Sequence, residues 1–384
     1  PVRFWSRVHF RFATKTIAAL AAAQMIVFAL IATYIEFEYI GKDRDRSVFS
    51  PPAEHLESLR SRAPVQNPRP RDPSLLRVLN FNAWEVEGWI PQFIVAASRD
   101  RELRLELIPP AVAELQPDIV ILQEVWKYQT RLKLIDEFRR LGFAFAVHGS
   151  DSMMSWFGIG NGLLIVSRLP LDPDVESKTF SRETRFDEGP LFARKGVLKT
   201  RVKVGAERWI DLYATHTGGF TTEERNGAGY NFYSSEQQTK AHQTLELVDF
   251  ITATNRSENL IVGADLNTHP YVFRNGAYVE GEFTPEYALL TCAGYPPGKV
   301  QAPSCLGLRD TFAMLHPSEH SAAYTYDTKE NFYANTGTFS YEPRGRIDYI
   351  FSKGAGLDPV DSQVVLNQFE LSDHYGLLTT FQLK

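Results

Sequence analysis

A run of strand-forming residues that ends abruptly in polar side chains is the feature that most restricts the fold of this chain. Residues 260–263 (LIVG) are typical of a buried strand, and Asp265, Asn267 and Pro270 follow. Side chains alternate along a strand, so Asp265 and Asn267, two positions apart, lie on one face. A carboxylate and an amide on one face suit a phosphate or metal site, although an ordinary Asx turn would have the same sequence.

The same pattern recurs along the chain. Other apolar runs end in or lead to chemically useful side chains, namely Asn82, Glu124, His216, Asp348, Asp373 and His374. An acid such as Glu124 at the end of a buried strand is costly unless a cation or a donor meets it, which favours metal ligation. Histidines, carboxylates and asparagines without a serine or cysteine nucleophile suit water-based hydrolysis of a phosphate with a hard cation such as Mg²⁺.

The order of these runs predicts the fold class. Strands are expected within residues 75–84, 117–126, 161–168, 195–203, 209–216, 260–265, 345–352 and 371–381. Helices are expected at 98–115, with Ser98 as N-cap and a break at Pro109-Pro110, and at 236–252. Because few helices connect the strands, an α/β (α+β) fold with two mixed or mostly antiparallel sheets and outer helices is favoured over a doubly wound parallel sheet.

Composition limits the possible partners. The net charge of −5 gives no general attraction to nucleic acid. The two cysteines, Cys292 and Cys305, are too few for a disulfide scaffold or a cysteine-based zinc site. They could close a loop in an oxidising compartment or remain two free thiols.

The N-terminal region predicts membrane attachment. Residues 17–35 are apolar and uncharged, and at 1.5 Å per residue they nearly span the ~30 Å bilayer core. Basic residues precede the segment and balanced charges follow it, which predicts a cytoplasmic N-terminus and an extracytoplasmic remainder. A cleaved signal peptide, a buried core helix and an interfacial helix are the alternatives. We therefore expect a membrane anchor (1–40), a proline-rich charged linker (41–74) and a catalytic domain (75–384).

Eight short motifs, in this order, resemble the endonuclease/exonuclease/phosphatase superfamily and, within it, the neutral sphingomyelinases. They lie at residues 80–84 (NFNAW), 122–126 (LQEVW), 161–168 (NGLLIVSR), 193–197 (ARKGV), 213–216 (YATH), 263–270 (GADLNTHP), 346–350 (RIDYI) and 371–374 (LSDH). The sphingomyelinase branch commonly carries a second histidine in Thr-His-x-His, whereas this chain has Thr215-His216-Thr217-Gly218. The resemblance implies a four-layered α/β/β/α sandwich with the site where the strand ends meet.

The resemblance also implies roles for the residues. Glu124 would hold Mg²⁺, or Mn²⁺ in its place, with Asn82 and Asp373 nearby. His374 would be the general base, oriented by Asp348. His216, Asp265 and Asn267 would bind the phosphate, and they would stabilise its developing charge or assist the leaving alkoxide.

Three further residues are expected to contact the substrate. In chains of this type Lys195 would reach the phosphate or couple closure of the site to an acid, for which Asp187 is a candidate; a solvated lysine is the alternative. Trp84 and Trp126 could enclose a quaternary ammonium by cation–π contact or simply pack beneath the site.

The combined expectation is a membrane-anchored, Mg²⁺-dependent phosphodiesterase of phospholipase-C type. It would act on sphingomyelin or a related phospholipid, and no nucleic acid partner is expected. The alternatives are another chemistry of the superfamily, as a nuclease or a phosphatase, and a non-catalytic membrane receptor with the same fold.

Overall fold

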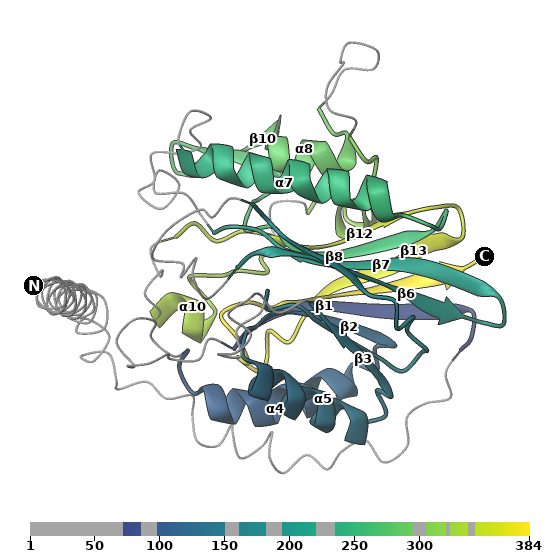
Figure 1. The fold of residues 1–384 in the computed structure, drawn as a ribbon. Helices are drawn as coiled ribbons and strands as arrows, with labels where there is room; N and C mark the ends of the chain where they lie inside the picture. The colour runs from purple at the N-terminus through teal and green to yellow at the C-terminus, as the bar shows by residue number, and fades with distance from the viewer. Residues whose placement is uncertain are drawn as a thin grey trace, which may run out of the picture. The chain divides into compact units, whose positions relative to one another are not determined.

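The computed structural model describes residues 72–85, 98–149, 161–181, 194–219, 235–294, 305–319, 323–336 and 342–384. Its centre is a pair of six-stranded sheets (Figure 1). The first sheet has, in order, β13 (Leu357–Val365), β14 (Gly376–Leu383), β1 (Leu75–Glu85), β2 (Ile119–Val125), β4 (Leu164–Ser167) and β3 (Phe145–His148). The second has β11 (Arg309–Asp310), β12 (Asp348–Lys353), β8 (Leu260–Asp265), β7 (Arg208–His216), β6 (Gly196–Val204) and β5 (Glu176–Thr179).

Each sheet contains one parallel pair among antiparallel neighbours. Helix α4 (Arg101–Glu114) connects the parallel strands β1 and β2, and α7 (Ser235–Thr254) connects β7 and β8. The remaining described elements are α5 (Tyr128–Arg140), α8 (Pro285–Thr291), α9 (Thr311–Leu315), α10 (Phe332–Thr336) and a hairpin of β9 (Tyr271–Arg274) and β10 (Ala277–Phe283). Helices α4 and α5 cover one outer face and α7 and α8 the other (Figure 1). The predicted α/β sandwich of two mixed sheets is confirmed.

Strand alternation divides the apolar side chains into three layers. Ile121 and Leu212 meet between the sheets, whereas Leu122 faces α4 and α5 and Val262 faces α7 and α8. The sheets approach closely at Gly263, because a Cβ there would lie 2.6 Å from Ile121 Cδ1. The side chains on the inner face of each strand therefore enter the space between the sheets.

Two details of the predicted helix 98–115 are wrong, the break at the prolines and the N-cap. The helix continues through Pro109 and Pro110, and it begins at Arg101 after Asp100. Ser98 does not cap it; its hydroxyl accepts a hydrogen bond from Arg104 (2.7 Å). The buried face of α4 packs on the first sheet, and this apolar contact offsets the two hydrogen bonds that proline cannot donate.

The predicted anchor and nearly all of the predicted linker lie outside the described residues. Within the described ranges, none of the helices has the length and apolarity needed to cross a bilayer. The division at residues 40 and 74 stays a prediction.

Candidate active site

Three predicted residues form one row across the second sheet. His216 at the end of β7 pairs in register with Asp265 at the end of β8, and Asp265 pairs with Asp348 at the start of β12. All three side chains are buried. Their strand neighbours Tyr213 and Tyr349 belong to the outer apolar layer, so the row faces the first sheet.

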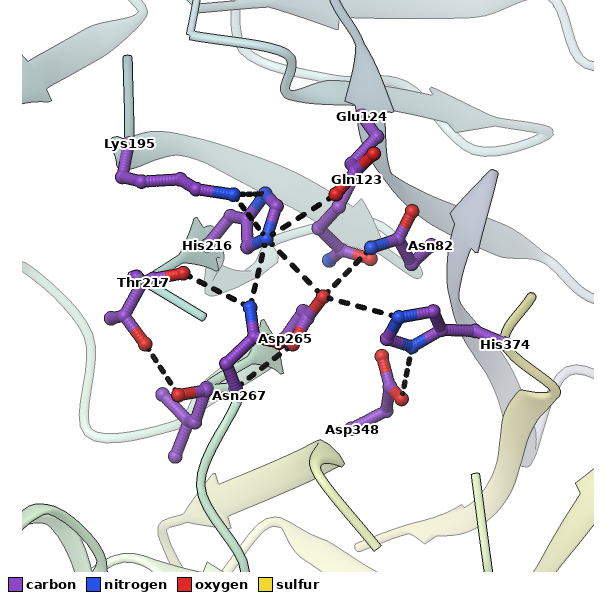
Figure 2. Close-up of polar contacts among 12 residues, drawn as sticks. Asn82, Gln123, Glu124, Lys195, His216, Thr217, Asp265, Asn267, Asp348 and His374 are labelled. Atoms are coloured by element: carbon purple, nitrogen blue, oxygen red, sulfur yellow. Dashed lines mark hydrogen bonds and ion pairs between the residues drawn. The ribbon is translucent and has the colours of Figure 1, made fainter. Parts of the chain in front are cut away.

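The first sheet completes the site (Figure 2). Asn82 Nδ2 donates to Asp265 Oδ2 (2.8 Å). His374, in the loop before β14, has its Nδ1 2.9 Å from Asp348 Oδ2. Its Nε2 lies 4.0 Å from Asp265 Oδ2. The His374-Asp348 pair, called the dyad below, therefore joins the two sheets.

Hydrogen-bond donors gather on the other side of Asp265 (Figure 2). Lys195 Nζ lies 2.8 Å from His216 Nε2, and Asn267 Nδ2 lies 3.2 Å from the same nitrogen. Asn267 Nδ2 also donates to Thr217 O (3.1 Å). The Asx turn exists too, since Asn267 N donates to Asp265 Oδ1 (3.0 Å). The turn thus places the amide of Asn267 in the site.

The two histidines have opposite electrostatic surroundings. Burial alone would lower the pKa of His374, but Asp348 and Asp265 raise it well above its ordinary value. Burial lowers the pKa of His216 well below the usual range, and the charges of Lys195 and His374 add to that effect. His374 therefore favours its protonated form, whereas His216 stays neutral.

The carboxylates suit a hard cation. Burial and the charge of Asp348 raise the pKa of Asp265 to about 7. Burial also raises the pKa of Asp373 to about 6, and Glu124 adds repulsion. Asp348 Oδ1 is buried without a hydrogen-bond partner among the described residues. A divalent cation would relieve this repulsion, so the oxygen-rich donor set fits Mg²⁺.

Among the described residues, one group of metal donors converges in the structure, and a second group was predicted from the sequence. Asp265, Asp348 and His374 each present a ligand atom, all within 4.8 Å of one another. The predicted group consists of Asn82 on β1, Glu124 on β2 and Asp373 in the loop before β14, and the charge of Glu124 acts on Asp373. Glu124 Oε1 is 3.7 Å from His216 Nε2, at the edge of the same cluster.

A comparison with protein families agrees with this geometry. The model of the endonuclease/exonuclease/phosphatase family matches residues 79–374, which contain every predicted site residue. The chain belongs to this family. It is accordingly a hydrolase, and its predicted resemblance to the sphingomyelinase branch is confirmed.

Similar proteins of the family include sphingolipid hydrolases. An inositol phosphosphingolipids phospholipase C from Schizosaccharomyces pombe is 24% identical over 323 residues, covering 80% of this chain and 69% of the relative. Two solved structures share the fold at 17% identity. Beta toxin from Staphylococcus aureus has a TM-score of 0.56, covering 79% of this chain and 99% of the toxin. Sphingomyelinase C from Streptomyces griseocarneus has 0.53, covering 80% and 99%.

The two tryptophans already face cations of the protein. The guanidinium of Arg104 lies 4.8 Å from the ring centre of Trp84. Lys195 Nζ lies 5.3 Å from the ring centre of Trp126, which is 6% exposed. Asp187, the candidate partner of Lys195, lies outside the described residues. The packing alternative is therefore favoured for Trp84, whereas Trp126 borders the site through Lys195 and His216.

Sequence reasoning missed several polar residues that support the site. Asn80 accepts a hydrogen bond from Gln123 (2.7 Å) and donates to Ala264 O (3.0 Å), so it ties the sheets together. Its position two residues before Asn82, on the same strand face, was the available signal. Lys240 on α7 donates to Asn267 O (2.8 Å), a contact for which the helix sequence gave no sign.

Proposed function

We propose that the chain is a membrane-anchored, Mg²⁺-dependent phosphodiesterase of phospholipase-C type that hydrolyses sphingomyelin or a related phospholipid. The products would be ceramide or diglyceride and a phosphorylated head group. The observation that carries this proposal is the cluster around Asp265, with a histidine–aspartate dyad on one side and the donors Lys195 and Asn267 on the other. Relatives whose names state sphingolipid phospholipase C activity support the substrate class.

The dyad supplies the base. His374 acts in its neutral form: once Nε2 has lost the proton that Asp348 and Asp265 favour, Nδ1 still donates to Asp348 and Nε2 takes a proton from the attacking water. A water–phosphorus bond forms, the bond from phosphorus to the lipid oxygen breaks, and a proton ends on that oxygen. Lys195, Asn267 and His216 bind the phosphate oxygens while charge builds up. The pKa of Asp265, about 7, lets it carry a proton beside an anionic phosphate.

We assign the metal to Glu124, Asn82 and Asp373, because Asp348 and His374 are already bonded to each other. When bound, Mg²⁺ would neutralise phosphate charge and acidify water.

We also propose that residues 17–35 anchor the enzyme with its catalytic part on the extracytoplasmic side. A lipid substrate lies in the plane to which such an anchor confines the enzyme, which raises its effective concentration. A disulfide between Cys292 and Cys305 supports an oxidising compartment.

The contacts of the two tryptophan rings favour inositol as a second candidate head group besides choline. Lys195 lies over one face of Trp126 and Arg104 over one face of Trp84, so a quaternary ammonium would compete with a protein cation at those faces. An uncharged inositol would need no such cage, and the fission yeast relative is named for inositol phosphosphingolipids.

The test is turnover of head-group-labelled sphingomyelin and inositol phosphosphingolipid in mixed micelles, with Mg²⁺ or with chelator. We expect His374→Ala to lower kcat by roughly 10²–10⁴-fold, because general base catalysis contributes about that much. Chelator should abolish turnover of the wild type. Cleavage of DNA or a phosphomonoester alone would replace the lipid assignment with a nuclease or phosphatase. No metal-dependent hydrolysis of any phosphoester would favour the non-catalytic receptor.

A further inference from the structure

A short segment outside the predicted motifs joins the two members of the dyad. Residues 325–331, called the strap below, run between the loop that carries His374 and the start of β12, which carries Asp348. Tyr326 forms antiparallel bridges with Gly345 on one side and His374 on the other. The strap therefore pairs with chain segments that lead into both sheets.

Thr325 is the residue of the strap that contacts the dyad-bearing backbone most directly. Its Oγ1 accepts hydrogen bonds from Ile347 N (3.0 Å) and Asp348 N (3.1 Å). Its carbonyl oxygen accepts from Tyr375 N (2.6 Å). Thr325 is fully buried, so no solvent replaces these bonds. One side chain thus fixes the start of β12, and its own backbone fixes the residue after His374.

Two further contacts join the strap to the loop that carries His374. The ring centres of Tyr326 and His374 are 5.2 Å apart. Asn331 Nδ2 donates to Ser372 O (2.9 Å), and Ser372 Oγ donates to Asn82 O (2.7 Å). The His374 loop is therefore held against both the strap and the end of β1.

We propose that Thr325 is a positioning residue for the proposed hydrolysis, on which this inference rests. It sets the backbone of Asp348 so that Oδ2 meets Nδ1 of His374, and Nε2 consequently points toward the reacting phosphate. This help is needed because the dyad bond spans two sheets, and a shift of either sheet changes its length. A misplacement of about 1 Å in a reacting group lowers rates by roughly 10²-fold.

The experiment compares Thr325→Val, which keeps the shape but loses the acceptor, with Thr325→Ser, which keeps the hydroxyl. The control is Thr379→Val: Thr379 is equally buried, and its hydroxyl contacts Thr311 and Ser362 rather than the dyad. In the full-length chain with Mg²⁺, Thr325→Val should lower kcat by roughly 10²-fold with KM changed less than about threefold. Thr325→Ser and Thr379→Val should stay within about threefold of wild-type kcat.

A second readout does not depend on substrate. The low-field proton NMR signal of His374 Nδ1–H, assigned by its loss in His374→Gln, reports the dyad bond in metal-free protein. It should disappear or move upfield in Thr325→Val and persist in Thr325→Ser and Thr379→Val. If Thr325→Val does not fold, Thr325→Ala, which also removes the Oγ1 acceptor, should have the same effect on the signal.

The outcomes separate the two proposals. An unchanged His374 signal in Thr325→Val, or equal losses of kcat in Thr325→Val and Thr379→Val, would overturn the positioning role. Failure of the wild type to hydrolyse phospholipids would overturn the proposed function, while the NMR comparison would still decide the role of Thr325.

Discussion

At the scale of single residues, the site is defined by how a few buried groups share protons. His374 and His216 are both enclosed between the sheets, yet they face different neighbours. Carboxylates raise the pKa of His374, whereas burial and Lys195 lower that of His216. Two side chains of the same type thus favour opposite protonation states.

This difference predicts two separate titrations. In metal-free protein, the NMR resonances of His374 should titrate above pH 6.5. Those of His216 should titrate below pH 6.5. A raised folded-state pKa means that the stability contributed by His374 is complete below pH 6.5 and is lost as the pH rises through the folded value. The unfolding free energy of the wild type relative to His374→Gln should therefore shrink as the pH rises above 6.5.

The depressed pKa of His216 gives the opposite sign. Its contribution is present above pH 6.5 and is lost as the pH falls, because the unfolded chain takes up the proton. A common midpoint for both histidines would contradict the assignment.

At the scale of elements, the ends of strands could be predicted and the contacts that hold them could not. Alternation placed Asn82, Glu124 and Asp265 at strand ends because period two is visible in a local sequence. Thr325 carries no such signal, since its partners are more than 20 residues away in the chain. The proline pair of α4 led to a wrong prediction of a helix break, because packing on a sheet overrides local helix preference.

Helix α4 illustrates a supporting element whose loss should affect the whole domain. Arg104 is buried, lies 3.4 Å from Glu85, and donates to Ala83 O (2.9 Å) and to Leu371 O (3.1 Å). Removing one partner of a buried ion pair costs roughly 3–5 kcal/mol. Arg104→Met should lower the free energy of unfolding in urea by about that amount.

The matched control is Arg140→Met on α5. The Arg140 side chain is 71% exposed and pairs with Glu137 on the surface, where substitutions usually change stability by less than about 0.5 kcal/mol. Equal effects of the two substitutions would show that the contacts of Arg104 add no stability.

At the scale of the whole molecule, a covalent bond supplements the noncovalent layers. Cys292 and Cys305 are joined, which resolves the two sequence alternatives in favour of the disulfide. The bond connects the end of α8 to the segment that leads into β11, and Leu306 N donates to Leu289 O nearby (3.0 Å). It therefore holds the outer layer against the second sheet.

Replacing both cysteines with serine should lower the unfolding free energy by about 3 kcal/mol, as expected for a loop of this size. Urea unfolding of wild type and variant, each with and without reductant, measures the difference. Reductant should bring the wild type to the level of the variant and leave the variant unchanged; a wild type insensitive to reductant would show that the bond does not stabilise the fold.

The two sheets share one order of parallel and antiparallel strand pairs, and this order determines which strand ends meet at the site. Each half of the chain contains one strand–helix–strand unit, β1-α4-β2 and β7-α7-β8. By register within the unit, the pair Asn82–Gln123 corresponds to the pair His216–Asp265. The two sheets are thus built on one plan, and the ends of their parallel pairs meet across the site, where Asn82 Nδ2 donates to Asp265 Oδ2 (2.8 Å).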